Sequence, residues 1–493
     1  MKPMKVLVAN RGEIAVRILR ACREMGLPSV AVFTDVDESA LHVRYADEAV
    51  CIGEKQKYLD IPTILEAALK SGATAIHPGY GFLAENAEFA RQVEEQGLTF
   101  IGPRPETVAM MGDKLAARRF SRQAGLPVIA GTDEPLPAEL PLDMAEKVQY
   151  PVLVKAAAGG GGRGIRLAIS AAELPGMIEA ARREAKAAFN DDTVFLESLV
   201  QQARHIEVQI LGDGKGNVVC LGERECSIQR RRQKLIEEAP ANGLSAELRS
   251  QVQQAALKLG KAMKYRSLGT VEFLLDKKKR FYFIEVNPRI QVEHPVTEMV
   301  TGVDIVKEQL LIAMGEPVRK SLENITPRGA AIEARILAED SQVGFLPSSG
   351  QVLYLKEPGG PGVRIDSALY QGMNVGTEYD SLLAKVIVWG ENRAVAIQRL
   401  RRALHEYQIG GLSTDIDFIL QIIESPKFVS GDVTTTYLET FEPVAQTTEP
   451  ELERDLAWVA ALFAHQQRTA SLIPEPSHGS TWQMIGWKEQ MNK

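Results

Sequence analysis

Apolar residues in the first 112 positions alternate between strand-like runs and helix-like stretches. Short runs such as KVLVA and SVAVF suit buried strands, and between them Ile14, Ile18, Cys22 and Met25 recur at helical spacing. The apolar runs AIHPG and TFIG continue the pattern, with helical stretches before and between them. Strands that alternate with helices favour a parallel sheet covered by helices. Residues 1–112 are therefore predicted to form a Rossmann-like domain.

The pattern changes after a proline-rich loop at positions 135–141. From Glu207 onward, alternating strands such as IEVQIL and FYFIEVN predominate, with one helix expected between Ala246 and Tyr265. The later segments RGAAIEARILAE, GQVLYL and LLAKVIVWG add strands before a helix at Arg393 to Leu404. The whole chain is thus expected to combine an α/β part with an α+β part.

A separate terminal helix is predicted after Phe441. Thr448 and Glu451 form a capping box, and Leu452, Leu456, Val459 and Phe463 recur on one helical face. Packing on the chain's own core is the favoured interpretation, and binding to a partner is the alternative.

Composition and charge exclude several classes of protein. The 493 residues carry a formal net charge of −7, which disfavours binding to bulk nucleic acid. The four cysteines form no C-x-x-C pair, so neither disulfides nor structural zinc are expected, and a reducing compartment fits. There is no apolar run long enough for a membrane span and no signal peptide pattern. A cytoplasmic protein without membrane partners is expected.

One glycine-rich stretch separates two predicted strands. KAAAGGGGRGIR, Lys155 to Arg166, follows YPVLV, and its glycines lack the Cβ atoms that keep a backbone away from a polyphosphate. Successive N–H groups in such a turn can point at anionic oxygens, and Lys155, Arg163 and Arg166 add positive charge. A flexible linker is the alternative, although such linkers are usually longer and rich in serine. Phosphate binding is favoured.

An acidic hairpin is predicted at Gly269 to His294. A four-residue loop would set Glu272 opposite Glu285, with Asn287 on the same strand face as Glu285. Facing carboxylates repel one another unless a cation or a proton lies between them. Three oxygen ligands suit Mg²⁺, whose remaining ligands would be phosphates and water. A solvated strand face is the alternative.

Two further clusters are open to more than one interpretation. Arg289, Gln291 and Glu293 follow the hairpin at intervals of two, where an arginine could hold an oxyanion while a glutamate removes a proton. Surface salt bridges have the same composition. The basic run QRRRQK, Gln229 to Lys234, is either a nucleic-acid or localisation patch or a grip for a small anion.

Several segments together resemble one family. ANRGEIAVRI, IHPGYGFLAEN, MGDK, KAAAGGGGRG, RHIEVQ, ERECSIQRRRQK, EEAP and IEVNPRIQVEHPVTEMVTGVD stand in the order of the biotin carboxylase component of biotin-dependent carboxylases, which has an ATP-grasp fold. The resemblance runs from about Lys5 to about Glu442. It implies a Rossmann-like N-terminal biotin carboxylase domain (1–112), an ATP-grasp lid with linker (113–200), an ATP-grasp body (201–328), a biotin carboxylase C-terminal domain (329–442) and a helical extension (443–493).

The resemblance also implies an activity. Such a chain uses ATP and bicarbonate, with Mg²⁺ or Mn²⁺, to carboxylate biotin on a carrier protein through carboxyphosphate. Lys234, Arg289 and the backbone of Val292 would hold bicarbonate, Glu293 would be its base, and Arg335 would bind biotin beside Tyr80. The metal ligands would be Glu272, Glu285 and Asn287. The nucleotide contacts would be Lys114, Lys155, Gly161 and Gly162 around the phosphates and Glu197, Ser198, Leu199, Val200, His205, Gln229 and Arg232 around the nucleoside.

Three positions depart from the family's pattern. Arg232 stands where histidine is common near the ribose, Ser198 replaces a frequent lysine, and Ala158 shortens the glycine run. Because arginine still donates hydrogen bonds, altered nucleotide affinity is expected rather than inactivity.

The resemblance extends to partners. The family's A/V-M-K-M/L turn for a biotinylated lysine has no match here, so a biotin carboxyl carrier protein on another chain and a carboxyltransferase subunit are expected. A homodimer or larger complex is expected too: Arg17, Arg20 and Glu24 lie near the place where relatives pair, although Pro361 replaces an aromatic residue there. The alternatives are an ATP-grasp ligase with another acceptor and a catalytically silent nucleotide-binding scaffold.

Overall fold

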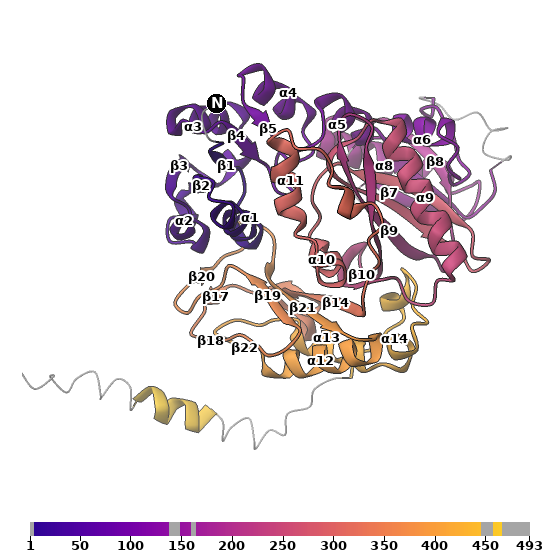
Figure 1. Cartoon of the computed structure of the whole chain (residues 1–493). Helices are drawn as coiled ribbons and strands as arrows, with labels where there is room; N and C mark the ends of the chain where they lie inside the picture. The colour runs from indigo at the N-terminus through magenta and orange to yellow at the C-terminus, as the bar shows by residue number, and fades with distance from the viewer. Residues whose placement is uncertain (1–3, 138–147, 159–163, 445–456, 466–493) are drawn as a thin grey trace, which may run out of the picture. The chain divides into compact units, whose positions relative to one another are not determined.

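The computed structural model describes residues 4–137, 148–158, 164–444 and 457–465 (Figure 1). The chain divides into two compact units, Met1–Glu442 and Pro443–Lys493. Every candidate site residue that the structure describes lies in the first unit. Across the described ranges, no helix is both long enough and apolar enough to cross a membrane.

A five-stranded parallel sheet opens the first unit, in the order β3-β2-β1-β4-β5. Its strands are β1 (Val6–Val8), β2 (Ser29–Thr34), β3 (Glu48–Gly53), β4 (Ala75–His77) and β5 (Thr99–Phe100). The accompanying helices are α1 (Gly12–Glu24), α2 (Leu41–Tyr45), α3 (Ile61–Ser71) and α4 (Ala87–Glu95). The predicted parallel sheet is confirmed, and β3 and α2 are additions that the apolar pattern did not reveal.

Local signals set several boundaries in this unit. Helix α3 begins where the Asp60 side chain accepts a hydrogen bond from the Thr63 N–H at 3.0 Å, with proline in the first turn. The predicted stop at Gly26 is confirmed, because this glycine follows α1 with a φ of +67°. Helix α9 (Ala246–Ala262) begins where Ser245 accepts from the Leu248 N–H at 3.2 Å.

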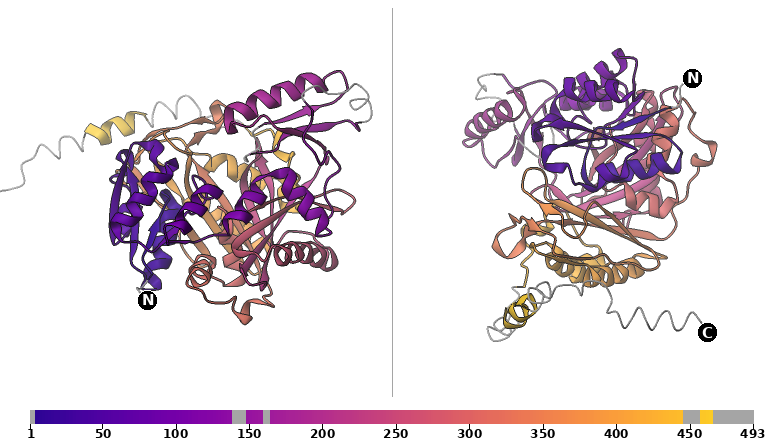
Figure 2. Two further views of the ribbon diagram at one scale, coloured as in Figure 1. Left: turned by 90° about the horizontal axis from the view of Figure 1, so that it is seen from above. Right: turned by 90° about the vertical axis from the view of Figure 1, so that its left-hand side faces the viewer.

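A three-stranded antiparallel sheet follows, in the order β7-β6-β8. Its elements are β6 (Val152–Ala156), β7 (Ile165–Ala168), β8 (Val194–Ser198) and helix α8 (Leu174–Phe189), which packs on β6 and β7 (Figure 2). Helices α5 (Pro105–Gly112) and α6 (Lys114–Gln123) precede it. The glycine stretch connects β6 to β7, as predicted, but residues 159–163 lie outside the described residues. The predicted loop position Pro141 lies outside them too.

The largest sheet has eight strands in the order β13-β12-β9-β10-β11-β14-β21-β19. These are β9 (Arg204–Asp213), β10 (Val218–Arg230), β11 (Gln233–Ala239), β12 (Arg266–Leu275), β13 (Phe281–Asn287), β14 (Ala330–Leu337), β19 (Val363–Ser367) and β21 (Leu382–Gly390). Helices α10 (His294–Thr301), α11 (Ile305–Ala313), α12 (Arg393–Glu406), α13 (Ile416–Glu424) and α14 (Pro426–Ser430) accompany it. The antiparallel pairing of β11 with β14 joins its two halves into one ladder.

The two faces of this sheet differ in character near β14 and β21. Helices α12 and α13 cover one face of the sheet here (Figure 1). Ala334 and Val386 lie on that face, within an apolar core. Their neighbours Arg335 and Lys385, which pair with each other across the strands, point to the face that α10 covers. Strand alternation therefore places the buried Lys385 and the half-buried Arg335 on the face that α10 covers.

Smaller elements complete the first unit. Three two-stranded sheets pair β15 (Glu339–Asp340) with β16 (Leu346–Pro347), β17 (Gly350–Gln351) with β20 (Asn374–Val375), and β18 (Tyr354–Lys356) with β22 (Gln408–Gly410). The 3₁₀ turns are η1 (Asp35–Asp37), η2 (Lys55–Leu59), η3 (Lys320–Leu322), η4 (Ser341–Val343) and η5 (Tyr437–Glu439).

Besides Pro443 and Val444, the second unit is described over one helical stretch, residues 457–465. Val459 and Phe463 of the predicted apolar face are helical there and exposed. Thr448, Glu451, Leu452 and Leu456 lie outside the described residues. Packing of this helix on the core stays a prediction, as do the internal boundaries at residues 112, 200 and 328.

Candidate active site

The predicted acidic hairpin is formed by β12 and β13. Glu272 pairs with Glu285, which confirms the predicted register. The route to that register differs from the prediction, because the residues between Leu275 and Phe281 make a five-residue connection rather than a four-residue one. A bulge at Ile284 adds one residue to β13 and restores the pairing.

Lys234, at the start of β11, lies at the centre of a carboxylate cluster. Its Nζ lies 2.5 Å from Glu207 Oε2, 2.9 Å from Glu272 Oε1 and 2.5 Å from Glu293 Oε1. Glu207 and Glu272 pair across β9 and β12, whereas Glu293 directly precedes α10. Burial opposes the charge of Lys234, but the three carboxylates raise the pKa of its ammonium group well above the ordinary value. The lysine is therefore charged and compensates three acids.

Glu293 contacts a second cation, Arg335 of β14. Arg335 Nη2 lies 3.1 Å from Glu293 Oε2, and Arg335 Nε donates to Glu237 Oε1 at 2.7 Å. Burial alone would raise the pKa of the Glu293 carboxyl, but Lys234, Arg335 and Arg224 hold it well below its ordinary range. Burial raises the pKa of Glu237 to about 7 despite its contact with Arg335. Two acids that share one arginine thus have opposite pKa shifts.

The sequence analysis missed Arg224, a fully buried residue of β10. Its guanidinium donates to Gln209 Oε1 at 2.9 Å and to Gln291 Oε1 at 3.0 Å, and it also contacts Glu207. Gln291 in turn donates to Glu272 Oε1 at 2.9 Å. A charged residue inside a strand of the sequence ERECSIQ was the available signal, because a buried arginine must find acceptors.

The segment between β13 and α10 carries the other predicted bicarbonate contacts. Arg289 Nη2 donates to Asn287 Oδ1 at 3.1 Å, and Arg289 Nε lies 3.0 Å from Glu85 Oε1. The Val292 carbonyl accepts from Lys385 Nζ at 2.8 Å, a contact that the sequence analysis also missed. The structure thus brings Arg289 and Val292 onto the same short segment as Glu293.

Glu272, Glu285 and Asn287 supply oxygen donors that fit a divalent cation. Asn287 Nδ2 donates to Glu272 Oε1 at 2.9 Å, so these side chains are in contact. Burial and the charge of Glu272 raise the pKa of the Glu285 carboxyl, while Lys114 and Lys155 oppose that shift. A cation between the two carboxylates would relieve their repulsion, and carboxylate and amide oxygens are ligands that Mg²⁺ accepts.

Cations and an acid meet where the nucleotide phosphates are expected. Lys155 Nζ lies 2.6 Å from Glu197 Oε1, and Arg118 Nη1 lies 2.9 Å from Glu197 Oε2. Burial lowers the pKa of Lys114, although Glu285 acts in the opposite direction. The backbone N–H of Lys114 donates to the Ala157 carbonyl at 3.0 Å, next to the glycine stretch. Gly161 and Gly162 lie outside the described residues.

The residues predicted around the nucleoside occupy three places. The Ser198 N–H, at the end of β8, donates to the Ala130 carbonyl at 2.8 Å, and Leu199 and Val200 follow it. His205 Nε2 lies 2.9 Å from Glu272 Oε2, and His205 Nδ1 lies 3.1 Å from Gln229 Nε2. Arg232 occupies the exposed turn between β10 and β11 with a φ of +67°.

Tyr80 lies in the loop after β4 and is half-buried. Its hydroxyl donates to Glu13 Oε1, and its carbonyl accepts from Asn10 Nδ2 at 2.7 Å. Burial raises the pKa of Tyr80, with the negative charge of Glu13 acting in the same direction. Tyr80 is therefore a neutral hydroxyl near the charge of Arg335, which partly offsets the shift.

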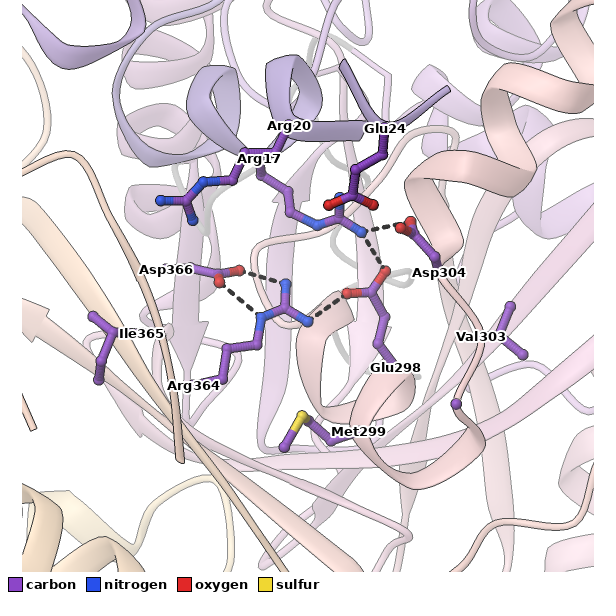
Figure 3. Close-up of a pocket in the computed structure, with 11 residues that line it drawn as sticks. Arg17, Arg20, Glu24, Glu298, Met299, Val303, Asp304, Arg364, Ile365 and Asp366 are labelled. Atoms are coloured by element: carbon purple, nitrogen blue, oxygen red, sulfur yellow. Dashed lines mark hydrogen bonds and ion pairs between the residues drawn. The ribbon is translucent and has the colours of Figure 1, made fainter. Parts of the chain in front are cut away.

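One charged cavity is lined by all three residues that are expected at a dimer contact (Figure 3). Arg17 Nη2 lies 2.9 Å from Glu298 Oε1 and 2.6 Å from Asp304 Oδ1. Arg364 Nη1 lies 2.6 Å from Glu298 Oε2, and Arg20 and Glu24 border the same cavity. Glu298 therefore bridges arginines from α1 and β19.

Three family models match the chain over most of its length. "Biotin carboxylase, N-terminal domain" matches residues 2–108, "Carbamoyl-phosphate synthase L chain, ATP binding domain" matches 113–321, and "Biotin carboxylase C-terminal domain" matches 333–440. Biotin carboxylase of Nostoc sp. is 52% identical over 89% of this chain and 99% of the relative. Biotin carboxylase 1 of Bacillus subtilis is 48% identical over 89% of this chain and 98% of the relative.

Solved structures agree with these sequence matches. A Campylobacter jejuni biotin carboxylase complexed with a ligand described as beta-gamma-ATP has a TM-score of 0.87 at 45% identity, covering 89% of this chain and 98% of that chain. The biotin carboxylase domain dimer of Hydrogenobacter thermophilus 2-oxoglutarate carboxylase, in complex with MgADP, ADP and bicarbonate, has a TM-score of 0.86 at 48% identity. That match covers 88% of this chain and 97% of the other.

The parallel sheet, the smaller antiparallel sheet and the acidic β-hairpin define an enzyme of the ATP-grasp class, a ligase that uses ATP. Among such enzymes the matches are specific, because they cover both ends of the first unit as well as its ATP-binding part. The chain belongs to the biotin carboxylase family.

Proposed function

We propose that this chain catalyses the ATP- and bicarbonate-dependent carboxylation of biotin, the first half-reaction of a biotin-dependent carboxylase. One observation carries the proposal: Glu293 contacts both Lys234 and Arg335. Glu293, the proposed base, thus lies between the cation proposed to hold bicarbonate and the cation proposed to hold biotin. This arrangement keeps the sites of the two consecutive steps next to each other. Neither another ATP-grasp ligase nor a silent scaffold requires this arrangement.

The first step makes carboxyphosphate. Lys234, Arg289 and the Val292 N–H hold bicarbonate, and Glu293 removes its proton. A carbonate oxygen then attacks the γ-phosphorus of ATP, the bond to the β-phosphate oxygen breaks, and ADP leaves. Glu293 is suited to this role because neighbouring cations keep it ionised, and a base must be ionised to accept a proton. Phosphoryl transfer between two anions also needs converging cations.

The second step carboxylates biotin. Carboxyphosphate breaks into CO₂ and a phosphate ion beside Arg335. The phosphate ion takes the ureido N–H proton of biotin, and the resulting biotin anion forms its new C–N bond with that CO₂. Arg335 stabilises the enolate-like oxygen of biotin, and Tyr80 lines the pocket. Arg335 is suited to the task because Glu237 holds its guanidinium at 2.7 Å, which fixes its orientation.

The nucleotide is held by two groups of residues. Lys114, Lys155, Gly161 and Gly162 grip the phosphates, and the nucleoside lies among Glu197, Ser198, Leu199, Val200, His205, Gln229 and Arg232. Glu272, Glu285 and Asn287 would hold Mg²⁺ or Mn²⁺, a cation that would neutralise the negative charge of the ATP phosphates. The donor chemistry of these three side chains supports this assignment.

The remaining elements of the proposal concern partners and location. Biotin is presented by a biotin carboxyl carrier protein, and a carboxyltransferase takes the carboxyl group onward. We also propose a homodimer that forms at the surface of α1, where Arg17, Arg20 and Glu24 lie, and a cytoplasmic location. Support for a dimer comes from the relative solved as one.

Release of ADP tests the function against both alternatives. The purified chain should release ADP from MgATP in a bicarbonate-dependent manner, and free biotin should stimulate that release. An ATP-grasp ligase with another acceptor would ignore bicarbonate. A scaffold would bind ATP without turnover. Either result would exclude the proposed activity.

A further inference from the structure

Lys385 is a lysine whose side chain is fully buried in an otherwise apolar strand, LLAKVIVWG. Its Nζ donates to the Val292 carbonyl at 2.8 Å, lies 3.0 Å from Glu13 Oε1 and lies 3.8 Å from Asp366 Oδ2. Burial opposes its charge, but Glu13, Glu333 and Asp366 raise the pKa of Lys385 above the ordinary value. The three described partners converge on one charged ammonium group.

The Val292 contact lies inside the bicarbonate segment. Val292 immediately precedes Glu293, whose carboxylate contacts Lys234 and Arg335. On the other side, Gln291 is held by Arg224 at 3.0 Å. Side-chain contacts thus fix both neighbours of Val292, and Lys385 fixes the backbone of Val292 itself.

Glu13 links the same ammonium group to the biotin side of the site. This glutamate lies in the first turn of α1 and is buried. Its Oε1 accepts from the Tyr80 hydroxyl as well as contacting Lys385. Tyr80 lies in a loop that follows the parallel sheet, and Val292 lies in a segment that follows the eight-stranded sheet. Glu13 and Lys385 form the bridge between them.

The bridge is anchored at its outer end. Asp366 makes a two-point contact with Arg364, with both N–O distances at 2.7 Å, and Arg364 continues to Glu298 in the cavity of Figure 3. Ion pairs hold Asp366 in place, and Lys385 lies between this acid and Glu13. The position of its ammonium group is therefore fixed.

We propose that Lys385 and Glu13 are positioning residues that hold the bicarbonate-binding backbone at Val292 and the biotin-facing Tyr80 in a fixed mutual arrangement. This inference rests on the proposed function. It adds two residues that touch neither reacting group but set the geometry in which CO₂ meets biotin. Small misplacements of reacting groups are costly, which gives such a bridge catalytic value.

The two ends of the bridge can be tested separately, because each should affect the KM of a different substrate. Lys385→Met removes the donor to Val292, so KM for bicarbonate should rise roughly tenfold to hundredfold, the range for losing a hydrogen bond to a charged group. KM for ATP should stay unchanged, because the described ATP-side contacts come from other elements. Glu13→Gln keeps the donor to Val292 but weakens the acceptor for Tyr80, so KM for free biotin should rise more than KM for bicarbonate.

A double variant separates positioning from charge balance. Lys385→Met alone leaves buried acids without their cation, whereas Glu13→Gln with Lys385→Met removes one charge of each sign and favours folding. Methionine still cannot donate to Val292, so bicarbonate KM should stay raised in the double variant. Recovery of the wild-type KM would show that only charge balance matters and would overturn the inference.

A matched control lies away from the site. Arg249 Nε lies 2.6 Å from Glu223, a buried acid, so Arg249→Met also removes a cation from a buried carboxylate. This variant should lose stability without a change in bicarbonate KM. The positioning role would be refuted if Arg249→Met raised the KM for bicarbonate as much as Lys385→Met does, or if Lys385→Met did not raise it. Neither result would refute the proposed function as long as the wild type shows bicarbonate-dependent turnover. Absence of bicarbonate-dependent turnover in the wild type would refute the function itself.

Discussion

Replacing Lys234 by methionine removes the cation that three carboxylates share. Each acid retains at least one other described cation or histidine, so the cluster does not lose all compensation: Glu207 keeps Arg224, Glu272 keeps His205, and Glu293 keeps Arg335. Breaking a buried ion pair typically costs about 3–5 kcal/mol, and the retained partners place this variant near about 3 kcal/mol. The folded state should therefore survive with a lower free energy of unfolding.

The loss of activity should be larger than that loss of stability suggests. Lys234 is proposed to hold the anion as charge develops, and removing one such donor typically lowers kcat by roughly 10²- to 10³-fold. The assay is bicarbonate-dependent ADP release at saturating MgATP, with urea unfolding of the same preparation. Lys278→Met is the matched control, because Lys278 lies exposed in the β12–β13 turn of the same sheet. A folded Lys234→Met variant that retains more than about a tenth of wild-type turnover would refute the assigned role.

Three further predictions address the metal, the biotin contact and pH. Glu272→Gln combined with Glu285→Gln should abolish MgATP turnover or shift it to much higher Mg²⁺, measured by a Mg²⁺ titration; an unchanged titration would contradict the metal assignment. Arg335→Met should lower biotin-stimulated ADP release by roughly 10²- to 10³-fold. The biotin-independent rate should fall less, and an unchanged ratio of the two rates would count against this role. The pKa of the Glu237 carboxyl is raised to about 7 in the folded state from an ordinary 4.5. Between these pH values the folded state therefore binds more protons than the unfolded state, so the free energy of unfolding falls as pH rises toward 7. The free energy of unfolding of Glu237→Gln minus that of wild type should therefore be larger at pH 8 than at pH 5, by on the order of 3 kcal/mol at most. Urea unfolding that gives the same difference at both pH values would contradict this.

Local pattern was sufficient for much of the fold. The parallel sheet of residues 1–112 was predictable because its short apolar runs and helical periodicity are properties of neighbouring residues. The pairing of Glu272 with Glu285 was also predicted correctly, but by assuming a regular hairpin. The five-residue connection and the bulge at Ile284 compensate for one another, and neither leaves a clear trace in the sequence.

Contacts between distant residues could not be derived in the same way. Lys234 and Glu293 are 59 positions apart, and their contact depends on the order of strands in the sheet. Lys385 did leave a signal in the sequence, because it is a single lysine among the apolar residues of a strand. A lysine at the solvent-exposed end of a strand would give the same pattern, so the signal is ambiguous. Its partner Glu13 lies 372 positions away, from the difference between 385 and 13, so only the folded chain identifies the pair.

The pairing of β11 with β14 has a consequence for how the two half-steps are spaced. β11 lies in the segment matched by the ATP-binding family model, and residues 333–337 of β14 lie in the segment matched by the C-terminal one. Because a continuous ladder of main-chain hydrogen bonds crosses that boundary, these segments cannot hinge apart without breaking it. Lys234 and Arg335 therefore stand at a separation set by strand geometry. A labile intermediate formed next to Lys234 can therefore reach Arg335 without a hinge motion between these two segments.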